Sequence, residues 1–572
     1  MKIPFPRPSY SALQALVPAV ALTALLGAIS LDAQVVIVPP KPVVGSGNPI
    51  SATPHVSVPS GKSCTVTLFQ DMEFANYNTN NFTYTPPSGC PGPWAKVVFT
   101  ADFTVTAGTQ YDRTGAFFLG GANIYFGTTA EPDTNLSPSW HVERDVTDLS
   151  SVFTAAQAGT AILGNYVGIY NGVDYNGIIY ANAHLIFYPA SFRDLAPIVP
   201  SVVVGLPGNS GATALNTPTS VYTQAVTLPT NVTSAYLDVT AQSQSDDEFW
   251  YTCVPNALAS ELESCGGTGF RETEITIDGT PAGVAPVYPW IYTGGIDPFL
   301  WQPIAGVQTL NFVPYRVDLT PFAGLLGDGV AHSVGIQVYN ADSYFQVAAN
   351  LLVYTDPFLK KVTGGVDSNT LTAEPDPQIT NSITTSASGV VTGSVVTTSN
   401  RKYSISGHVN TSFGPVRTTV NRTVDFAQTE TFNVSSTQDQ QNIVQKTTVE
   451  GDTETSIHGF STHAAVSIVY PFALGYNYVV NPDGSAYQTT QTNQQDLVNT
   501  GAGFFASTLS NTVAAQDTLN WDASGNFTGN TNNKSTQNYI ATDPFTGCYS
   551  EKLTSAGGVL TAATSGSGCH PW

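Results

Sequence analysis

Short runs of apolar residues separated by turn formers recur along most of this sequence. Between residues 63 and 200 such runs lie at 96–99, 115–121 and 183–188, and between 201 and 360 they lie at 235–239 and 333–339. Short strands at this spacing, bounded by Gly, Pro, Asn and Ser, are typical of antiparallel β-sandwiches. Both stretches close on an apolar-aromatic run followed by proline, at 185–189 and 351–357, which indicates a duplicated architecture.

The C-terminal part of the chain has a different composition. From about residue 361 it shifts towards Ser, Thr, Asn and Gln, but apolar and polar residues still alternate, as at 402–406 and 464–470. Alternation with a period of two indicates half-buried strands, and a disordered Ser/Thr-rich tail is the alternative. We therefore predict an all-β fold, with two packed antiparallel jelly-roll or β-sandwich domains and a β-rich C-terminal domain. The predicted segments are a signal peptide at 1–33, a Pro-rich linker at 34–62, a first β-sandwich at 63–200, a second at 201–360 and a Ser/Thr-rich β domain at 361–572.

Composition supports this class and excludes others. Charged residues make up 10% of the 572 residues, against about 25% in an average soluble domain. Gly and Pro number 50 and 38, and aromatic residues make up 11%. Turn formers and aromatics in such numbers favour β structure over helix bundles. The net charge of −22 repels phosphate backbones, so nucleic acid is excluded as a partner.

The N-terminus and the cysteines indicate export. Lys2 and Arg7 precede an apolar stretch that ends on small residues near Ala33, which is the pattern of a secretory signal; an uncleaved membrane anchor is the alternative. Six cysteines form three pairs that are close in sequence: Cys64 with Cys90, Cys253 with Cys265, and Cys548 with Cys569. Because CxxC and HExxH spacings are missing, disulfides are favoured over metal sites, although six cysteines allow many pairings. We expect a secreted or periplasmic protein without a metal or other cofactor, free of the membrane after signal cleavage.

Acidic residues beside aromatics are the strongest candidates for chemistry, because P-loop and nucleophile-elbow motifs are missing. In the densest example, three carboxylates at 246–248 precede Phe-Trp-Tyr at 249–251. One interpretation is a turn before a core strand. The other is a carbohydrate site, where aromatic faces stack on sugar CH groups and carboxylates accept hydrogen bonds from hydroxyls.

The sequence from about residue 64 to 356 resembles the peptide-N4-(N-acetyl-β-glucosaminyl)asparagine amidase A family, because several uncommon strings occur in the same order. They are Tyr-Asp-Arg at 111–113, Phe-Leu-Gly-Gly at 118–121, Thr-Ala-Glu-Pro at 129–132, Val-Glu-Arg-Asp-Val-Thr at 142–147, Asp-Glu-Phe-Trp-Tyr at 247–251, Phe-Arg-Glu at 270–272, Tyr-Thr-Gly-Gly-Ile-Asp-Pro at 292–298, Leu-Trp-Gln-Pro at 300–303 and Ala-Ala-Asn-Leu at 348–351. The Asp-Arg pair before an apolar strand also resembles the distantly related bacterial F-type enzyme, a fold of two packed jelly rolls in which the aspartate is essential. The F-type glutamate that precedes a Phe-Arg string has no counterpart here, where residues 266–269 are Gly-Gly-Thr-Gly.

The resemblance implies hydrolysis of the amide between asparagine and the innermost N-acetylglucosamine of N-glycans, which leaves aspartate in the peptide and releases a glycosylamine. The partners are then N-glycosylated peptides or glycoproteins, and the acid-active members of the family suit the acidic composition. An endo-type glycosidase with paired carboxylates and a β-sandwich that binds glycans without cleaving them are the alternatives.

The resemblance also implies roles for individual residues. We predict that Asp112 activates water, that Glu248 replaces the missing glutamate as sugar ligand or proton donor, and that Arg113 or Arg271 stabilises the oxyanion. An aspartate kept ionised by Arg113 is a better base in acid than histidine. Trp250 and Trp301 are the predicted aromatic walls for sugar. The other predicted substrate-binding residues are Asp247, Tyr251, Arg271, Glu272, Glu131 and Glu143. The C-terminal region is expected to serve stability or substrate access.

Overall fold

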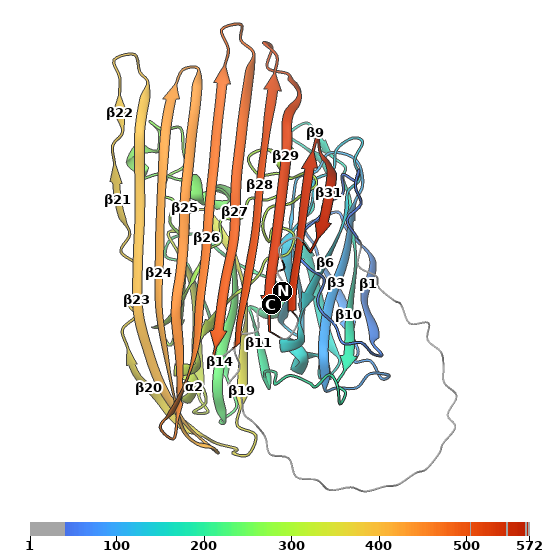
Figure 1. Ribbon diagram of the computed structural model, residues 1–572, viewed down its shortest axis with the longest axis vertical. Helices are drawn as coiled ribbons and strands as arrows, with labels where there is room; N and C mark the ends of the chain where they lie inside the picture. The colour runs from blue at the N-terminus through green and yellow to red at the C-terminus, as the bar shows by residue number, and fades with distance from the viewer. Residues whose placement is uncertain (1–40, 504, 545–546, 567–568, 570–572) are drawn as a thin grey trace, which may run out of the picture.

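β-sheets dominate the computed structural model, which describes residues 41–572 except 504, 545–546, 567–568 and 570–572 (Figure 1). The signal peptide predicted at 1–33 lies outside the described residues. The strands form several small antiparallel sheets and one long C-terminal sheet, which confirms the predicted all-β class. The helical segments are short: η1 (Thr147–Thr154), η2 (Gly208–Ser210), η3 (Ser245–Asp247), η4 (Trp250–Thr252), α1 (Asn256–Ala259), η5 (Pro298–Trp301), η6 (Thr320–Phe322) and α2 (Ala323–Leu326).

The first β-sandwich consists of two four-stranded sheets. One sheet has the order β1 (Cys64–Phe74), β10 (Ile179–Pro189), β3 (Trp94–Val105) and β6 (Ser139–Asp145), and the other has the order β2 (Thr79–Tyr84), β7 (Gln157–Leu163), β4 (Thr114–Leu119) and β5 (Ala122–Thr128). A hairpin of β8 (Gly168–Tyr170) and β9 (Val173–Tyr175) stands apart from both. Phe99 and Phe103 of β3 face Phe117 of β4, with ring centroids 6.3 and 6.0 Å apart. Alternate residues of each strand thus bury aromatic rings between the sheets.

A second sandwich follows. Its first sheet has the order β11 (Val202–Leu206), β19 (Tyr344–Thr355), β14 (Val232–Gln244) and β17 (Tyr315–Asp318), with β12 (Thr213–Leu215) also paired to β19; its second has the order β13 (Val221–Thr227), β18 (Ala331–Tyr339), β15 (Glu272–Ile277) and β16 (Thr280–Pro286). The two sandwiches are joined by the buried amide of Asn350, which bonds both the N–H and the C=O of Asn123 at 2.9 Å. Strands β5 and β19 of the two sandwiches therefore meet at one boundary.

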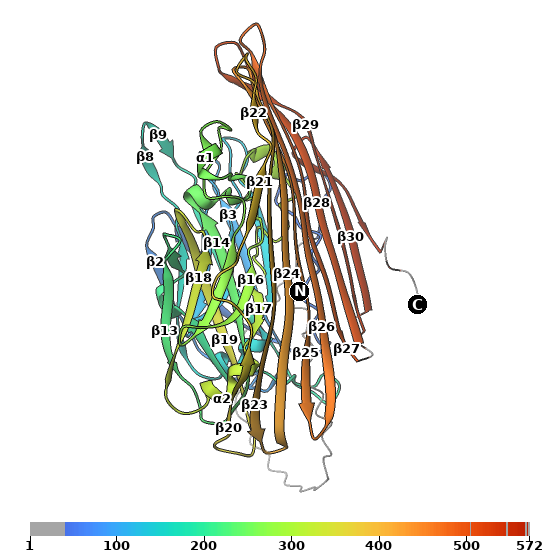
Figure 2. The ribbon, with the colours of Figure 1, turned by 90° about the vertical axis from the view of Figure 1, so that its left-hand side faces the viewer.

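The C-terminal sheet is a layer of long antiparallel strands that packs against the sandwiches (Figures 1 and 2). Its order is β20 (Thr363–Asn369), β23 (Val391–Thr411), β24 (Gly414–Ser435), β25 (Gln438–Ile457), β26 (Phe460–Val480), β27 (Ala486–Ala502), β28 (Phe505–Trp521), β29 (Phe527–Asp543), β30 (Gly547–Ala556) and β31 (Val559–Ser565), with β21 (Gln378–Asn381) and β22 (Thr384–Thr385) also on β23. Its buried face places Phe426 against Phe270 and Phe472 against Tyr251, at centroid distances of 5.0 Å. The alternating pattern is therefore strand structure and not a disordered tail.

Glutamines on the buried face of this sheet hold loops of the second sandwich. Gln428 Nε2 donates to Tyr251 O at 2.7 Å, and Gln488 Nε2 donates to Ile296 O at 3.0 Å. A buried carbonyl without a partner would cost about as much as a lost hydrogen bond. The polar composition of the C-terminal region thus suits a layer that covers irregular backbone.

All three predicted disulfides are present: Cys64–Cys90, Cys253–Cys265 and Cys548–Cys569. The described part of the predicted linker is extended but packed, since Ile50 N donates to Pro303 O at 2.9 Å and Ala52 N donates to Gln537 Oε1 at 2.7 Å. Within the part of the chain that the structure describes, no helix has the length and apolar character needed to cross a bilayer. The domain boundaries given by the sequence remain a proposal.

Candidate active site

The β4–β5 hairpin brings Asp112 and Glu131 together. Its pairing continues beyond the strand ends, where Thr129 N donates to Arg113 O at 2.8 Å and Arg113 N donates to Thr129 Oγ1 at 2.8 Å. The residues that flank this pair must then meet, and Asp112 N donates to Glu131 Oε1 at 2.9 Å. Two acids that are far apart in the sequence therefore become neighbours through strand register.

Glu248 of the second sandwich adds a third carboxylate. It follows β14 and η3, and it lies within electrostatic range of both Asp112 and Glu131. Gly294 closes another side, because its N–H hydrogen-bonds to the Asp112 carboxylate. A Cβ atom at position 294 would overlap the Glu131 carboxylate and lie 3.0 Å from Asp112 Oδ1. We call Asp112, Glu131 and Glu248 the acidic cluster.

Burial and mutual repulsion keep protons on the acidic cluster. Burial, together with the charge of Asp112, raises the pKa of Glu131 to about 8. Burial, together with the charges of Asp112 and Glu131, raises the pKa of Glu248 to about 8 as well. The pKa of Asp112 is also raised by burial, and a hydrogen bond in which Glu131 is the protonated partner acts in the opposite direction. Glu131 and Glu248 therefore keep their protons below a pH of about 8, which places two carboxylic acids beside the Asp112 carboxyl group, the kinds of group that general acid–base catalysis uses.

Arg113 is directed at its neighbours. Its Nε and Nη2 donate to Gln110 Oε1 at 3.1 and 2.5 Å, and its guanidinium lies over the ring of Tyr111, 5.7 Å from the centroid. The Arg113 charge lowers the pKa of Asp112, but burial outweighs it. The expectation that Arg113 keeps Asp112 at a low pKa is therefore wrong.

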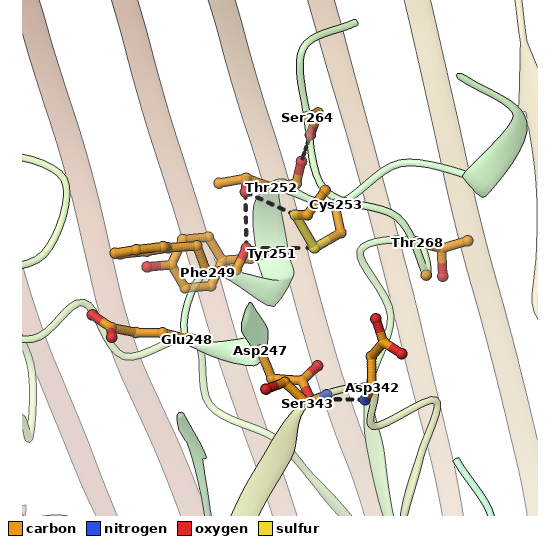
Figure 3. Close-up of a disulfide and its surroundings, with 12 residues drawn as sticks. Asp247, Glu248, Phe249, Tyr251, Thr252, Cys253, Ser264, Thr268, Asp342 and Ser343 are labelled. Atoms are coloured by element: carbon orange, nitrogen blue, oxygen red, sulfur yellow. Dashed lines mark hydrogen bonds between the residues drawn. A yellow bond between two sulfur atoms is a disulfide. The ribbon is translucent and has the colours of Figure 1, made fainter. Parts of the chain in front are cut away.

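Asp247 and Arg271 form a buried ion pair. Arg271 Nη2 donates to Asp247 Oδ1 at 2.9 Å, and each side chain is 1% exposed. Asp247 Oδ2 also accepts from the N–H groups of Asp342 and Ser343 at 2.8 and 2.9 Å, as Figure 3 shows. A pair so enclosed cannot reach a ligand, which corrects its predicted role in substrate binding. Its effect is to fix the turn that carries Glu248.

The Cys253–Cys265 disulfide anchors the segment on the other side of Glu248 (Figure 3). Ser264 Oγ donates to Thr252 O at 2.6 Å across the same loop. The turn that carries Glu248 is thus held by an ion pair before it and by a disulfide after it.

Glu272 and Glu143 both make contacts that connect separate parts of the chain. Glu272 is 2% exposed and accepts from Arg401 Nη1 of β23 at 2.8 Å, so it joins the second sandwich to the C-terminal sheet. Glu143 accepts from Val56 N at 2.8 Å and bonds His141 Nε2 at 3.3 Å. Burial raises the pKa of Glu143, but its hydrogen bonds to His141, His55 and Val56 outweigh burial and lower the pKa to about 2. Glu272 is enclosed like Asp247, which corrects its predicted role in substrate binding, whereas the Glu143 side chain is 10% exposed and its role in substrate binding stays a prediction.

Trp250 and Trp301 belong to the core, with exposed fractions of 1% and 2%. The Trp250 ring lies 5.8 Å from that of Tyr251, which in turn packs on Phe472. The prediction that these tryptophans form walls for sugar is therefore wrong, because burial of their large apolar surface prevails. Tyr251 is buried too, although it lies within electrostatic range of Glu248.

The sequence reasoning missed Gly294 and the role of its neighbours. Tyr292 OH donates to Ser243 O at 2.8 Å, and Thr293 Oγ1 donates to Thr129 O at 2.6 Å. The Tyr-Thr-Gly-Gly string at 292–295 thus ties β14 of the second sandwich to the loop of Glu131 in the first. A glycine within an uncommon string was the available signal, since glycine allows close approach of other groups to the backbone.

The acidic cluster lies in the part of the chain that matches a known protein family. A family model described as peptide N-acetyl-beta-D-glucosaminyl asparaginase amidase A matches residues 49–372. The chain is 27% identical over 492 residues to peptide-N4-(N-acetyl-beta-glucosaminyl)asparagine amidase A of Prunus dulcis, which covers 82% of this chain and 84% of that protein.

Two solved structures are similar at low TM-scores. PNGase F, a glycosylasparaginase from Flavobacterium meningosepticum, gives a TM-score of 0.33 and 12% identity over 52% of this chain and 96% of that chain. PNGF-II gives a TM-score of 0.35 and 14% identity over 51% of this chain and 65% of that chain.

Proposed function

This chain belongs to the peptide N-acetyl-β-D-glucosaminyl asparaginase amidase A family, and on that premise we propose that its acidic cluster hydrolyses the amide between asparagine and the innermost N-acetylglucosamine of N-glycans. The observation that carries the assignment is the meeting of Asp112, Glu131 and Glu248 at the boundary of the two sandwiches. Amide hydrolysis needs a base for water and an acid for the leaving nitrogen. The cluster offers a group for each role, with Asp112 as the base and Glu248, whose pKa is raised to about 8, as the acid.

Asp112 is the proposed base. Its carboxylate accepts the Gly294 N–H and the proton on Glu131, so its orientation is fixed. The oxygen of an activated water adds to the amide carbon while Asp112 takes one water proton. The carbon–nitrogen bond then breaks as the nitrogen takes a proton from Glu248. The products are aspartate in the peptide and a glycosylamine, which loses ammonia in solution.

Charge on the developing oxyanion is offset by Arg113. Its guanidinium is close enough to Asp112 to lower that pKa, and a fixed positive charge in a partly buried site favours a transition state that gains negative charge. N-glycosylated peptides and glycoproteins are the proposed substrates. The three disulfides support secretion as the proposed location.

Product analysis tests the reaction. A denatured glycopeptide is incubated with the protein in water enriched in heavy oxygen, and the peptide product is weighed. An amidase places one heavy oxygen in a new aspartate. A single sugar retained on asparagine identifies a glycosidase instead, and an unchanged glycopeptide identifies binding without cleavage. Either of these last outcomes contradicts the proposal.

Two isosteric variants test the site. Asp112→Asn and Glu248→Gln should each lose about 10²–10⁴-fold in kcat, the range that general acid–base catalysis supplies, while Tm stays close to that of the unchanged protein. Asp246→Asn is the matched control, because Asp246 is exposed and adjoins the same turn. An Asp112→Asn protein that keeps more than about a tenth of the rate contradicts the assignment of the base.

A further inference from the structure

Five tyrosines form a connected aromatic surface beside the acidic cluster, and we call Tyr77, Tyr111, Tyr166, Tyr170 and Tyr175 the tyrosine surface. Tyr111 immediately precedes Asp112, and its ring lies 5.4 Å from that of Tyr175. The ring of Tyr166 lies 6.4 Å from that of Tyr175 and 6.5 Å from that of Tyr170. Tyr77 is stacked on Tyr166 at 6.4 Å. The contacts therefore run from Asp112 to the β8–β9 hairpin, which projects from the edge of the molecule in Figure 2.

Much of this surface is open to solvent. Tyr77 is 66% exposed, Tyr111 53% and Tyr170 62%, and Ile169 of the same hairpin is 73% exposed, whereas Tyr175 is 8% exposed and connects Tyr111 to Tyr166 from beneath. Large apolar side chains scattered singly need no explanation, but contiguous ones usually mark a binding site. Their contact with a residue next to Asp112 connects this surface to the proposed site of hydrolysis.

The backbone holds the tyrosine surface in place before any ligand arrives. The β8–β9 hairpin turns at Asn171 and Gly172, with φ of 51° and 80°, which is the two-residue Asn-Gly turn that favours a tight hairpin. Gly164 leaves room for Tyr77, because a Cβ atom there would lie 3.0 Å from the Tyr77 ring. A surface ordered in this way loses little conformational entropy on binding.

The tyrosine surface is also near Glu248, the member of the acidic cluster that the second sandwich contributes. Tyr344 lies within electrostatic range of both Tyr77 and Glu248. Its OH donates to Gln244 Oε1 at 3.4 Å, and Gln244 Nε2 donates to Thr114 Oγ1 at 2.9 Å, two residues after Asp112. A chain-like ligand bound at Asp112 and Glu248 can therefore extend away from the acidic cluster over these rings.

We propose that the tyrosine surface binds the part of the oligosaccharide that lies beyond the innermost sugar, an inference that rests on the proposed function. A sugar ring presents CH groups on its faces and hydroxyls around its rim, and exposed tyrosines offer ring faces and phenol hydroxyls to match both. The five side chains are uncharged, as a neutral oligosaccharide requires. The surface is thus a subsite that reads the length of the glycan.

The test compares two glycopeptides with one peptide sequence. One carries the whole oligosaccharide, and the other is trimmed to the two innermost sugars. In Tyr170→Ala and Tyr77→Ala, the ratio of kcat/KM for the long substrate to kcat/KM for the short one should fall about tenfold, the effect of losing one aromatic contact of ~1.4 kcal/mol. Tyr170→Phe keeps the ring face and should keep most of the ratio. Phe192→Ala is the control, because Phe192 is 91% exposed and follows β10 at its far end.

Failure of this inference can be told apart from failure of the proposed function. The free oligosaccharide is titrated into each protein by calorimetry, which requires no cleavage, and Tyr170→Ala should bind it about tenfold more weakly. A ratio and an affinity that both stay within about twofold of the unchanged protein overturn the subsite. Equal losses on the long and short substrates also overturn it, because they assign the tyrosines to the peptide. If the wild-type protein cleaves neither substrate, the proposed function is refuted. The affinities for the free oligosaccharide then still decide whether the tyrosine surface is a subsite.

Discussion

Asp297, at the start of the η5 segment, and Asp517 of β28 share a hydrogen bond between their carboxyl groups, across the boundary of the second sandwich and the C-terminal sheet. Two carboxyl groups can bond in this way only while one of them is protonated. Burial, with the charge of Asp517, raises the pKa of Asp297 to about 7. This boundary therefore contains a contact that depends on a proton.

Other acids at the same boundary behave alike. Burial raises the pKa of Glu274 and of Glu430 to about 8, and that of Glu272 to about 7. Burial also raises the pKa of Asp496, on β27, to about 6. Each of these carboxyl groups binds a proton more tightly in the folded chain than in the unfolded one.

The first prediction is that stability falls as the pH rises from about 5 to about 8. A carboxyl group with a raised folded-state pKa contributes stability that is fully present below its unfolded pKa and is lost as the pH passes through its folded pKa. For these groups the unfolded pKa is about 4 and the folded pKa reaches about 8. The Tm measured by calorimetry should therefore decrease steadily as the pH rises from about 5 to about 8.

The Asp517→Asn variant isolates one part of this effect. An asparagine amide can donate to Asp297 at any pH, so the variant should lose less Tm between about pH 5 and about pH 8 than the unchanged protein does. Asp483→Asn, at an exposed β26–β27 turn, is the control. A Tm that rises with pH over this range would contradict the role of these buried acids.

The second prediction concerns Gly294. In Gly294→Ala the new methyl group overlaps the Glu131 carboxylate and crowds Asp112, so the two acids must separate. We expect a loss of at least about 10²-fold in kcat, because displacement of catalytic groups by about 1 Å has effects of this size. The control is Gly61→Ala, which places a methyl group in open space at a φ that alanine accepts. Gly279→Ala is unsuitable because the φ of Gly279 is 75°.

Folding must be separated from activity in the Gly294→Ala protein. Its Tm and its titration with free oligosaccharide report on the fold and on binding, and kcat reports on the chemistry. Activity within about threefold of the unchanged protein would show that the contact of Glu131 with Asp112 does not matter for hydrolysis.

The third prediction is an alkaline limit of activity near pH 8. Glu131 and Glu248 must keep their protons to serve as partner of the base and as acid, and both have a pKa of about 8. The rate kcat/KM should therefore fall above a pH of about 8. A pH–rate profile on one glycopeptide measures it. A rate that keeps rising beyond that pH would exclude protonated carboxyl groups from the mechanism.

Much of the fold could be predicted from the sequence because β structure has local signals. Alternation and turn residues indicated strands in all three regions, and proximity in the sequence indicated the correct cysteine pairs. The acidic strings also named all members of the acidic cluster: Asp112, Glu131 and Glu248.

The sequence could not separate ligands from structural partners, because that depends on contacts between distant segments. Glu272 resembles Glu131 as an acid in a family string, but Glu272 meets Arg401 from the C-terminal sheet, whereas Glu131 meets another acid. Trp250 and Tyr170 are both aromatic, yet the former is buried in the core and the latter is exposed on a hairpin. These differences in burial and in contact partners become visible only once the long-range packing is known.

The last prediction is that Asp247 and Arg271 stabilise the turn of Glu248 and do not bind substrate. Removal of one member of a buried ion pair leaves the other charge without compensation, which costs about 3–5 kcal/mol of folding free energy. Asp247→Asn and Arg271→Gln should therefore each lower Tm strongly, and denaturant unfolding measures the loss. The double variant should lose less than the sum of the two, because no uncompensated charge remains. At temperatures where each protein is folded, KM should change by no larger a factor than kcat does. A protein with Arg271→Gln that keeps its Tm but loses binding of substrate would instead restore Arg271 to the site that the sequence predicted.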